Sequence, residues 1–176
     1  MNIEQVLETA TRGIGKNYFQ LPIDGRETPI YRERVYCYEL YHQLRVNWPK
    51  ETEYELSGEV DKAGHPLIRG NDLDNTKPDL LVHIPGDMSG NHTIIEVKPI
   101  TASRDGIKKD LFTLTAFHRN AGYRKAIYLL YGSGSIGAIL ETILELGFSD
   151  EGSRIDLTCI EVWWHSSVGN GAERLK

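Results

Sequence analysis

The stretch HTIIEVKPI, residues 92–100, has the composition of a buried strand with an acid and a base at its far end. Its apolar residues are mostly β-branched, and such residues are enriched in strands. Glu96 and Lys98 lie two positions apart, so in a strand their side chains point to the same face of the sheet. Pro99 cannot donate a hydrogen bond to a neighbouring strand, so we expect the ladder to end there. The stretch therefore predicts a core strand with a carboxylate and an ammonium at one end of a sheet.

A second apolar run, PDLLVHIP, precedes this strand and is joined to it by the segment GDMSGN. A connection this short predicts an antiparallel hairpin. If His83 pairs with His92, the same register places Asp79 opposite Glu96. Two carboxylates and Lys98 are then expected to meet at one end of the sheet.

The rest of the chain supplies the other elements of one domain, since 176 residues fit a single hydrophobic core. Residues 1–27 mix a short helix with turn residues and are expected to form an N-terminal arm packed on the domain. After the arm we expect a helix (31–45), three strands (52–61, 78–85 and 92–99), a helix (103–119), a strand (125–131), a helix (136–146) and a strand (154–164). This order predicts an α/β (α+β) domain, in which a central mixed sheet is flanked by helices on both faces.

The charge of the chain narrows the classes of partner. Lys and Arg total 20 against 25 for Asp and Glu, which gives a formal charge of -5 and excludes a generic polyanion binder. Any contact with nucleic acid then requires a local basic patch.

Two further features bear on the location of the protein. The sequence has no run of about 18 consecutive apolar residues, so we expect no membrane-spanning helix and no membrane partner. The two cysteines, Cys37 and Cys159, lie far apart and are expected to be buried apolar residues in a reducing compartment. These features predict a cytoplasmic protein.

The first helix carries two acids close to its apolar stripe. At about 100° per residue, Glu33 lies in the middle of the stripe formed by Tyr36, Leu40 and Leu44, whereas Glu39 lies at its edge. An acid on a core-facing stripe needs a partner. A salt bridge to an arginine, a first-turn position favoured by the helix dipole, or a metal bound by a third carboxylate would each satisfy Glu33.

The expected pair of Asp79 and Glu96 also needs a positive partner. Two carboxylates within a few ångströms repel each other and raise each other's pKa unless a positive charge lies between them. A divalent cation supplies that charge, and hard oxygen ligands favour Mg²⁺ or Mn²⁺ over zinc.

The motif Pro78-Asp79, followed after the hairpin by Glu96-Val97-Lys98, resembles that of the PD-(D/E)xK nuclease superfamily, the restriction-endonuclease-like fold. Members of the superfamily share an acid-bearing helix, a three-stranded meander with the motif, a second helix and a fourth strand. The resemblance therefore implies a restriction-endonuclease-like core in the order αβββαβ.

The resemblance covers the chain from about residue 31 to residue 131 and implies that residues 132–176 are a C-terminal αβ elaboration. It further implies a nuclease that hydrolyses phosphodiester bonds of nucleic acid, with DNA as the expected substrate, by means of a metal-activated water. Lys98 would orient or activate that water and stabilise charge on the phosphate. The metal ligands that it implies for Mg²⁺ or Mn²⁺ are Asp79, Glu96, the backbone carbonyl of Val97 and Glu33, with Glu39 as the alternative helix acid.

Nucleic acid must reach the same end of the sheet, and basic residues flank the motif. The residues that could contact phosphates are Lys77, Arg69, Arg104, Lys108 and Lys109, each of which could equally lie on a solvated surface. The tyrosines of the first helix are expected in the core or an interface, with base stacking as the alternative. A homodimer or a partner protein is also compatible with the resemblance.

Other readings of the sequence remain open. The chain could be a binding or assembly module of the same fold with a weak or silent metal site. Gly132, Gly134 and Gly137 have the spacing of a dinucleotide-binding turn between a strand and a helix, which leaves a nucleotide-binding protein as another alternative. His83 and His92 are expected to form a satisfied core pair rather than a zinc site.

Overall fold

The computed structural model describes residues 1–58, 73, 76–149 and 154–175. The helices are α1 (Ile3–Arg12), α2 (Lys16–Phe19), α3 (Glu33–Val46), α4 (Arg104–Asn120) and α5 (Gly137–Phe148), with a 3₁₀ turn at Met88–Gly90. The strands are β1 (Glu55–Gly58), β2 (Leu80–His83), β3 (Thr93–Pro99), β4 (Lys125–Tyr131), β5 (Ile160–His165) and β6 (Glu173–Arg174).

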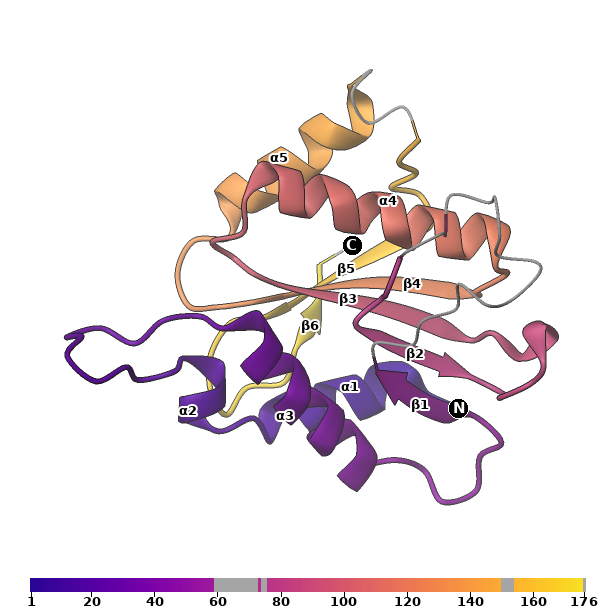
Figure 1. The fold of residues 1–176 in the computed structure, drawn as a ribbon, viewed down its shortest axis with the longest axis horizontal. Helices are drawn as coiled ribbons and strands as arrows, with labels where there is room; N and C mark the ends of the chain where they lie inside the picture. Colours follow the sequence, from indigo (N-terminus) through magenta and orange to yellow (C-terminus); the bar gives the residue numbers. More distant parts are fainter. Residues whose placement is uncertain (59–72, 74–75, 150–153, 176) are drawn as a thin grey trace.

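The strands form one open, mixed sheet of six strands in the order β1-β2-β3-β4-β5-β6 (Figure 1). Antiparallel pairing joins β1 to β2 and β2 to β3. The short connection between β2 and β3 permits only an antiparallel pair. The pairs β3–β4 and β4–β5 are parallel, and each is connected through a helix, α4 or α5. The predicted mixed sheet with helices on both faces is confirmed.

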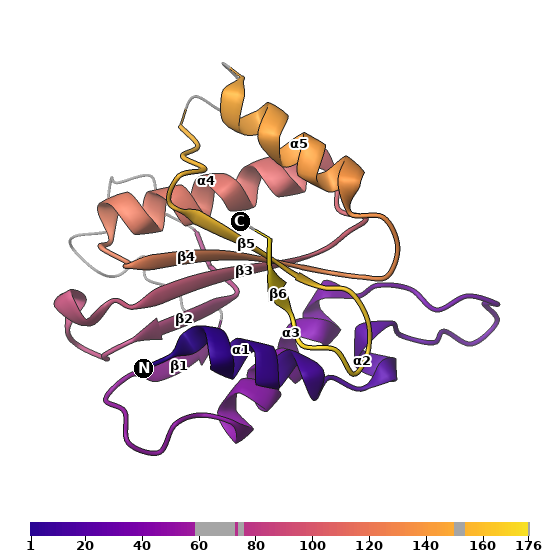
Figure 2. The ribbon, with the colours of Figure 1, turned by 180° about the vertical axis from the view of Figure 1, so that it is seen from behind.

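Each face of the sheet is covered by its own layer of helices. Figures 1 and 2 show α4 and α5 on one face and α1, α2 and α3 on the other. Alternate side chains of β4 enter opposite cores, so that Tyr128 lies in the core beneath α4 and α5, and Leu129 in the core beneath α1 and α3. β4 is thus buried on both faces, as its continuous apolar sequence indicates.

The predicted register of the hairpin is confirmed. Leu80 pairs with Ile95 and Leu81 with Ile94, which is the register that places Asp79 opposite Glu96. β3 ends at Pro99 as predicted, although the amide of the next residue still donates one bond to β4.

The two helices beside the hairpin lie within two residues of their predicted bounds, and their apolar stripes are buried. On α3 the buried residues are Tyr36, Leu40 and Leu44. On α4, Ser103 caps the first turn by accepting a hydrogen bond from the Gly106 amide at 3.3 Å, which satisfies one of the free N–H groups. The N-terminal arm also belongs to a helical layer, because α1 buries its apolar face in the core with α3.

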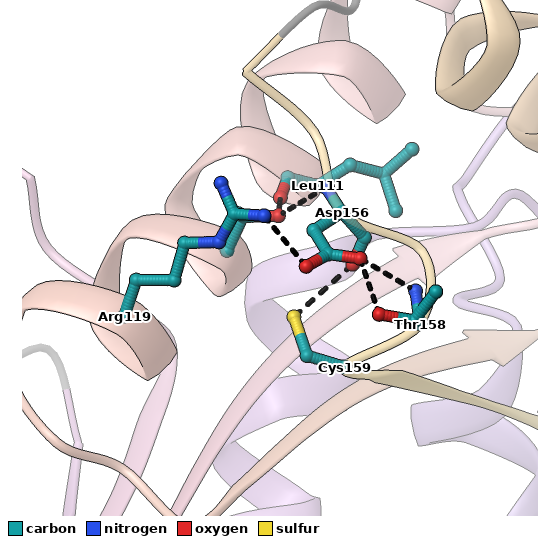
Figure 3. A network of polar contacts seen from close by, with 6 residues as sticks. Leu111, Arg119, Asp156, Thr158 and Cys159 are labelled. Carbon is teal, nitrogen blue, oxygen red and sulfur yellow. Dashed lines mark hydrogen bonds and ion pairs between the residues drawn. The ribbon is translucent and has the colours of Figure 1, made fainter.

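The prediction of a strand from residue 154 was wrong, because β5 begins at Ile160. Figure 3 shows the reason, a turn held by the side chain of Asp156. One oxygen of this carboxylate accepts the Thr158 amide at 3.0 Å, and the other lies 2.6 Å from Arg119 Nη2 of α4. Local bonds from an Asp side chain compete with strand pairing. The strand predicted from residue 52 begins later, because residues 52–54 precede β1 (Glu55–Gly58). Residues 59–61 of that prediction lie outside the described residues.

No helix within the described parts of the chain is long and apolar enough to cross a membrane.

Candidate acid and lysine site

The carboxyl groups of Asp79 and Glu96 meet where β2 begins and β3 ends. Asp79 directly precedes β2, and its Oδ2 accepts a hydrogen bond of 2.8 Å from the Val97 amide. Glu96 is 5% exposed and points into the α4 side of the sheet. The backbone therefore fixes one carboxylate, and the interior of the protein encloses the other.

Burial raises the pKa of both carboxyls, and the neighbouring charges add to the effect. For Glu96 the pKa lies well above its usual range because of burial, and then because of the charges of Asp79 and Asp110. A hydrogen bond between the two groups raises the pKa of Glu96 and lowers that of Asp79, whose own burial still dominates. The pair therefore holds a proton more strongly than two separate carboxyls.

Lys98 lies between two acids from opposite faces of the sheet. Its Nζ is 2.8 Å from Glu33 Oε2, at the start of α3, and 3.4 Å from Asp110 Oδ2, on α4. Burial alone would lower the pKa of Lys98, but the charges of Asp110 and Glu33 raise it above its ordinary value. The ammonium stays protonated near neutral pH, so it can stabilise charge but is a poor proton acceptor.

Asp110 is a site residue that the sequence reasoning missed. Its side chain is 5% exposed, and burial raises the pKa of the carboxyl to about 7. Asp110 lies on the buried stripe of α4 between Ile107 and Leu114. An acid at helical spacing within an apolar stripe was the available signal, as it was for Glu33.

Tyr128 is a second missed residue. It pairs with Glu96 across β3 and β4, on the same face of the sheet. Within the described structure its buried hydroxyl has no hydrogen-bond partner. Burial raises its pKa well above the ordinary value, and the charges of Asp110 and Glu96 raise it further. This hydroxyl therefore lies close to the acids and is available to them.

The two acids of α3, Glu33 and Glu39, contact protein side chains. Glu33 forms a salt bridge, with Lys98 rather than an arginine, and Glu39 accepts a hydrogen bond of 2.7 Å from Gln43 Nε2 on its own helix. Among the described residues, no three or more His, Cys, Asp or Glu side chains are grouped so that they could hold a metal ion. The oxygen donors Asp79 and Glu96 are the pair on which the predicted metal site depends.

The predicted phosphate-contacting residues differ in exposure and partners. Arg104 Nη1 binds Glu145 of α5 at 2.8 Å, and Lys77 and Lys109 are exposed, whereas Lys108 is half-buried. Arg69 lies outside the described residues. The first turn of α4 does lie against the site, since a Cβ at Gly106 would be 3.9 Å from Lys98 Cε. The helix that carries three of these cations thus begins beside Lys98.

The glycine turn at residues 132–137 is shaped by close packing. Gly132 has a φ of 138°, and a Cβ there would lie 2.7 Å from Ile100 Cγ1. The Ser133 amide, which a bound phosphate would use, donates to the Tyr31 hydroxyl at 2.9 Å. The nucleotide-binding alternative stays a prediction. Close packing accounts for the glycine at position 132, and the Ser133 amide already donates to a side chain of this protein.

The two histidines of the hairpin each contact a hydroxyl group, and the two cysteines are unpaired thiols. His83 Nε2 lies 3.1 Å from Ser57 Oγ, and His92 Nδ1 lies 2.7 Å from Thr93 Oγ1, so each ring is satisfied by a neighbouring hydroxyl. Cys37 and Cys159 are free thiols and are half-buried rather than fully buried. Burial raises the pKa of both thiols, which makes them unreactive near neutral pH.

Neither a family model, a curated protein nor a solved structure matches this chain. The chemistry of the site is therefore the basis on which a function is proposed.

Proposed function

We propose that the protein is a Mg²⁺- or Mn²⁺-dependent hydrolase that cleaves phosphodiester bonds of nucleic acid, with DNA as the expected substrate. The observation that carries the proposal is the meeting of Asp79, Glu96 and Lys98 at one end of the hairpin strands. The order of α3, β1 to β3, α4 and β4 is also that expected of a PD-(D/E)xK nuclease core.

The charge balance of the site favours a divalent cation. Glu33, Asp79, Glu96 and Asp110 lie around the single ammonium of Lys98, and burial raises the pKa of three of these acids. Carboxylate oxygens are the donors that Mg²⁺ and Mn²⁺ prefer, so the pair of Asp79 and Glu96, with the carbonyl of Val97, fits such an ion. When bound, the ion would lower the pKa of a coordinated water and neutralise charge on the phosphate.

The residues of the chain have separate tasks in this reaction. Glu33 and Asp110 hold the Lys98 ammonium from two sides, which keeps it charged and restricts its position. A fixed ammonium in a partly buried site stabilises negative charge on the phosphate more strongly than one in water. We assign Lys98 to this electrostatic task and to orienting the water, rather than to accepting its proton.

Metal binding is tested by thermal unfolding with increasing Mg²⁺ or Mn²⁺. We expect the wild type to be stabilised and Asp79→Asn to respond much less, because a ligand that binds only the folded state raises its stability. The exposed Asp105 provides the matched control, Asp105→Asn, which should respond like the wild type. Equal metal responses in the wild type and Asp79→Asn would contradict the proposed site.

Catalysis is tested on plasmid and single-stranded DNA. We expect cleavage that requires the metal and falls by at least about 100-fold in Lys98→Ala, the cost of removing one preorganised electrostatic group. Lys16→Ala removes an exposed lysine of α2 that is not among the predicted phosphate-contacting residues, and it should retain activity. Unchanged cleavage by Lys98→Ala would refute the assigned role.

A binding or assembly module with a weak metal site is the second candidate. It is favoured by the ion pairs of Lys98, whose charge is already neutralised by Glu33 and Asp110. Metal-dependent protection of DNA without any cleavage would support the module over the hydrolase.

A further inference from the structure

A pocket of about 360 Å³ opens beside the acid and lysine site. Its walls come from α3, from the last residue of β1 and from the start of β2. The described residues that line it are Cys37, Tyr38, Tyr41, Gly58, Asp79 and Leu80. Asp79 therefore belongs both to this pocket and to the pair of carboxyls at the proposed catalytic centre.

The two tyrosines give the pocket aromatic walls. Tyr38 is 62% exposed, so its ring is available to a ligand. Tyr41 is half-buried, and its hydroxyl lies 3.4 Å from the Leu56 carbonyl oxygen of β1, which holds the ring near the strand. A flat apolar ligand could contact both rings without displacing the core.

Gly58 keeps the strand side of the pocket open. A Cβ at this position would lie 3.6 Å from the Tyr41 ring and 3.6 Å from the Asp79 carbonyl oxygen, which is ordinary contact. Alanine therefore fits, whereas a longer side chain would extend into the space between Tyr41 and Leu80. The absence of a side chain at Gly58 is one cause of the pocket.

The charge of the walls indicates which part of a nucleic acid would enter. Among the described residues that line the pocket there is no cation, and one is the acid Asp79, so these walls would repel a phosphate group. A nucleobase is neutral and flat, and stacking on an aromatic ring is available to every base. The formal charge of -5 also limits binding through phosphates, so base contacts would have to supply part of the affinity.

We propose that this pocket binds one unpaired nucleobase next to the scissile phosphate, so that the substrate is single-stranded or locally unpaired nucleic acid. The inference rests on the proposed function, because it uses Asp79 as the link between pocket and catalytic centre. A base held between Tyr38 and Tyr41 positions its own phosphate at the end of the hairpin. A paired base cannot enter, because its face is stacked within the duplex.

The test measures binding of a single-stranded oligonucleotide that carries the fluorescent base 2-aminopurine. Glu96→Gln serves as the background for all variants in Mg²⁺, since it keeps an oxygen donor while impairing the proposed reaction. We expect Tyr38→Ala and Gly58→Leu each to weaken binding about tenfold, which corresponds to the loss of one stacked base. The quenching of 2-aminopurine seen on binding should disappear in both variants.

Two matched controls separate the pocket from general effects. Gly58→Ala should bind like the parent, because a Cβ meets only ordinary contacts. Tyr18→Ala removes another exposed tyrosine, on α2 and outside the pocket, and should also bind like the parent. A blunt duplex of the same sequence should show no difference between Tyr38→Ala and the parent. Thermal unfolding of each variant checks that it remains folded.

The outcomes separate the two proposals. If the wild type cuts nucleic acid but folded Tyr38→Ala and Gly58→Leu bind and quench like the parent, the pocket inference is overturned and the hydrolase stands. If quenching depends on Tyr38 but the wild type never cuts, the pocket stands and the hydrolase is overturned. If no oligonucleotide binds in Mg²⁺ or Mn²⁺, to the wild type or the parent, both are overturned.

Discussion

Replacing Asp110 with asparagine tests the electrostatics of the site most directly. Burial raises the pKa of this carboxyl from 3.8 to about 7, with the Lys98 ammonium opposing the rise and the charges of Asp79 and Glu33 adding to it. One pKa unit corresponds to about 1.4 kcal/mol, so ionisation of Asp110 lowers the free energy of unfolding by about 4 kcal/mol. Asp110→Asn keeps the shape of the side chain and removes the charge.

The sign follows from proton binding. Between the unfolded pKa of 3.8 and the folded pKa of about 7, the folded chain holds a proton that the unfolded chain releases. The free energy of unfolding therefore falls as the pH rises through this window. We expect Asp110→Asn to resemble the wild type near the lower limit and to unfold at a higher Tm above the upper one. The gain should be about 10 °C, since 1 kcal/mol shifts the Tm of a chain of this size by about 2–4 °C.

The assay is thermal unfolding followed by circular dichroism across this pH window, with a chelator to exclude divalent metal. Asp105→Asn is the control, because Asp105 is an exposed acid in the first turn of the same helix. It should keep the pH dependence of the wild type. If Asp110→Asn is less stable than the wild type above the window, the ion pair with Lys98 outweighs burial and the reasoning is refuted.

Three further predictions concern stability. Tyr36→Phe leaves Nδ1 of the buried His165 without its partner at 2.8 Å and should cost about 1–3 kcal/mol in chemical unfolding; an unchanged midpoint would exclude a stabilising bond. Gly90→Ala places a Cβ 2.6 Å from Ile84 Cβ and should lower Tm by several degrees, since about 1–3 kcal/mol is typical of overpacking. Hydrogen bonds from Thr158 and Arg119 lower the pKa of Asp156 from 3.8 to about 2. The ionised carboxylate should therefore stabilise the fold by about 1 kcal/mol, and this stabilisation should vanish as the pH falls from 3.8 to about 2. Asp156→Asn should flatten the fall of Tm with pH in this acid range.

Local sequence patterns were sufficient for the strands that carry the site. Because side chains alternate along a strand, the short connection and the apolar faces of the hairpin set the pairing that places Asp79 opposite Glu96. The same approach failed at β5, where the Asp156 side chain bonds to Thr158 and holds a turn inside an apolar sequence. The short strand β6 was not predicted, since its two exposed residues have no apolar alternation to reveal them.

The sequence by itself determined which chemical groups are present and at which end of the sheet Asp79, Glu96 and Lys98 lie. Only the tertiary structure decided which of them touch. Lys98 contacts Glu33 on α3 and Asp110 on α4, helices that cover opposite faces of the sheet. Contacts between separate layers depend on how each helix packs, and the periodicity of a single helix or strand does not encode that packing. For the same reason the pocket beside Asp79 could be found only in the folded chain.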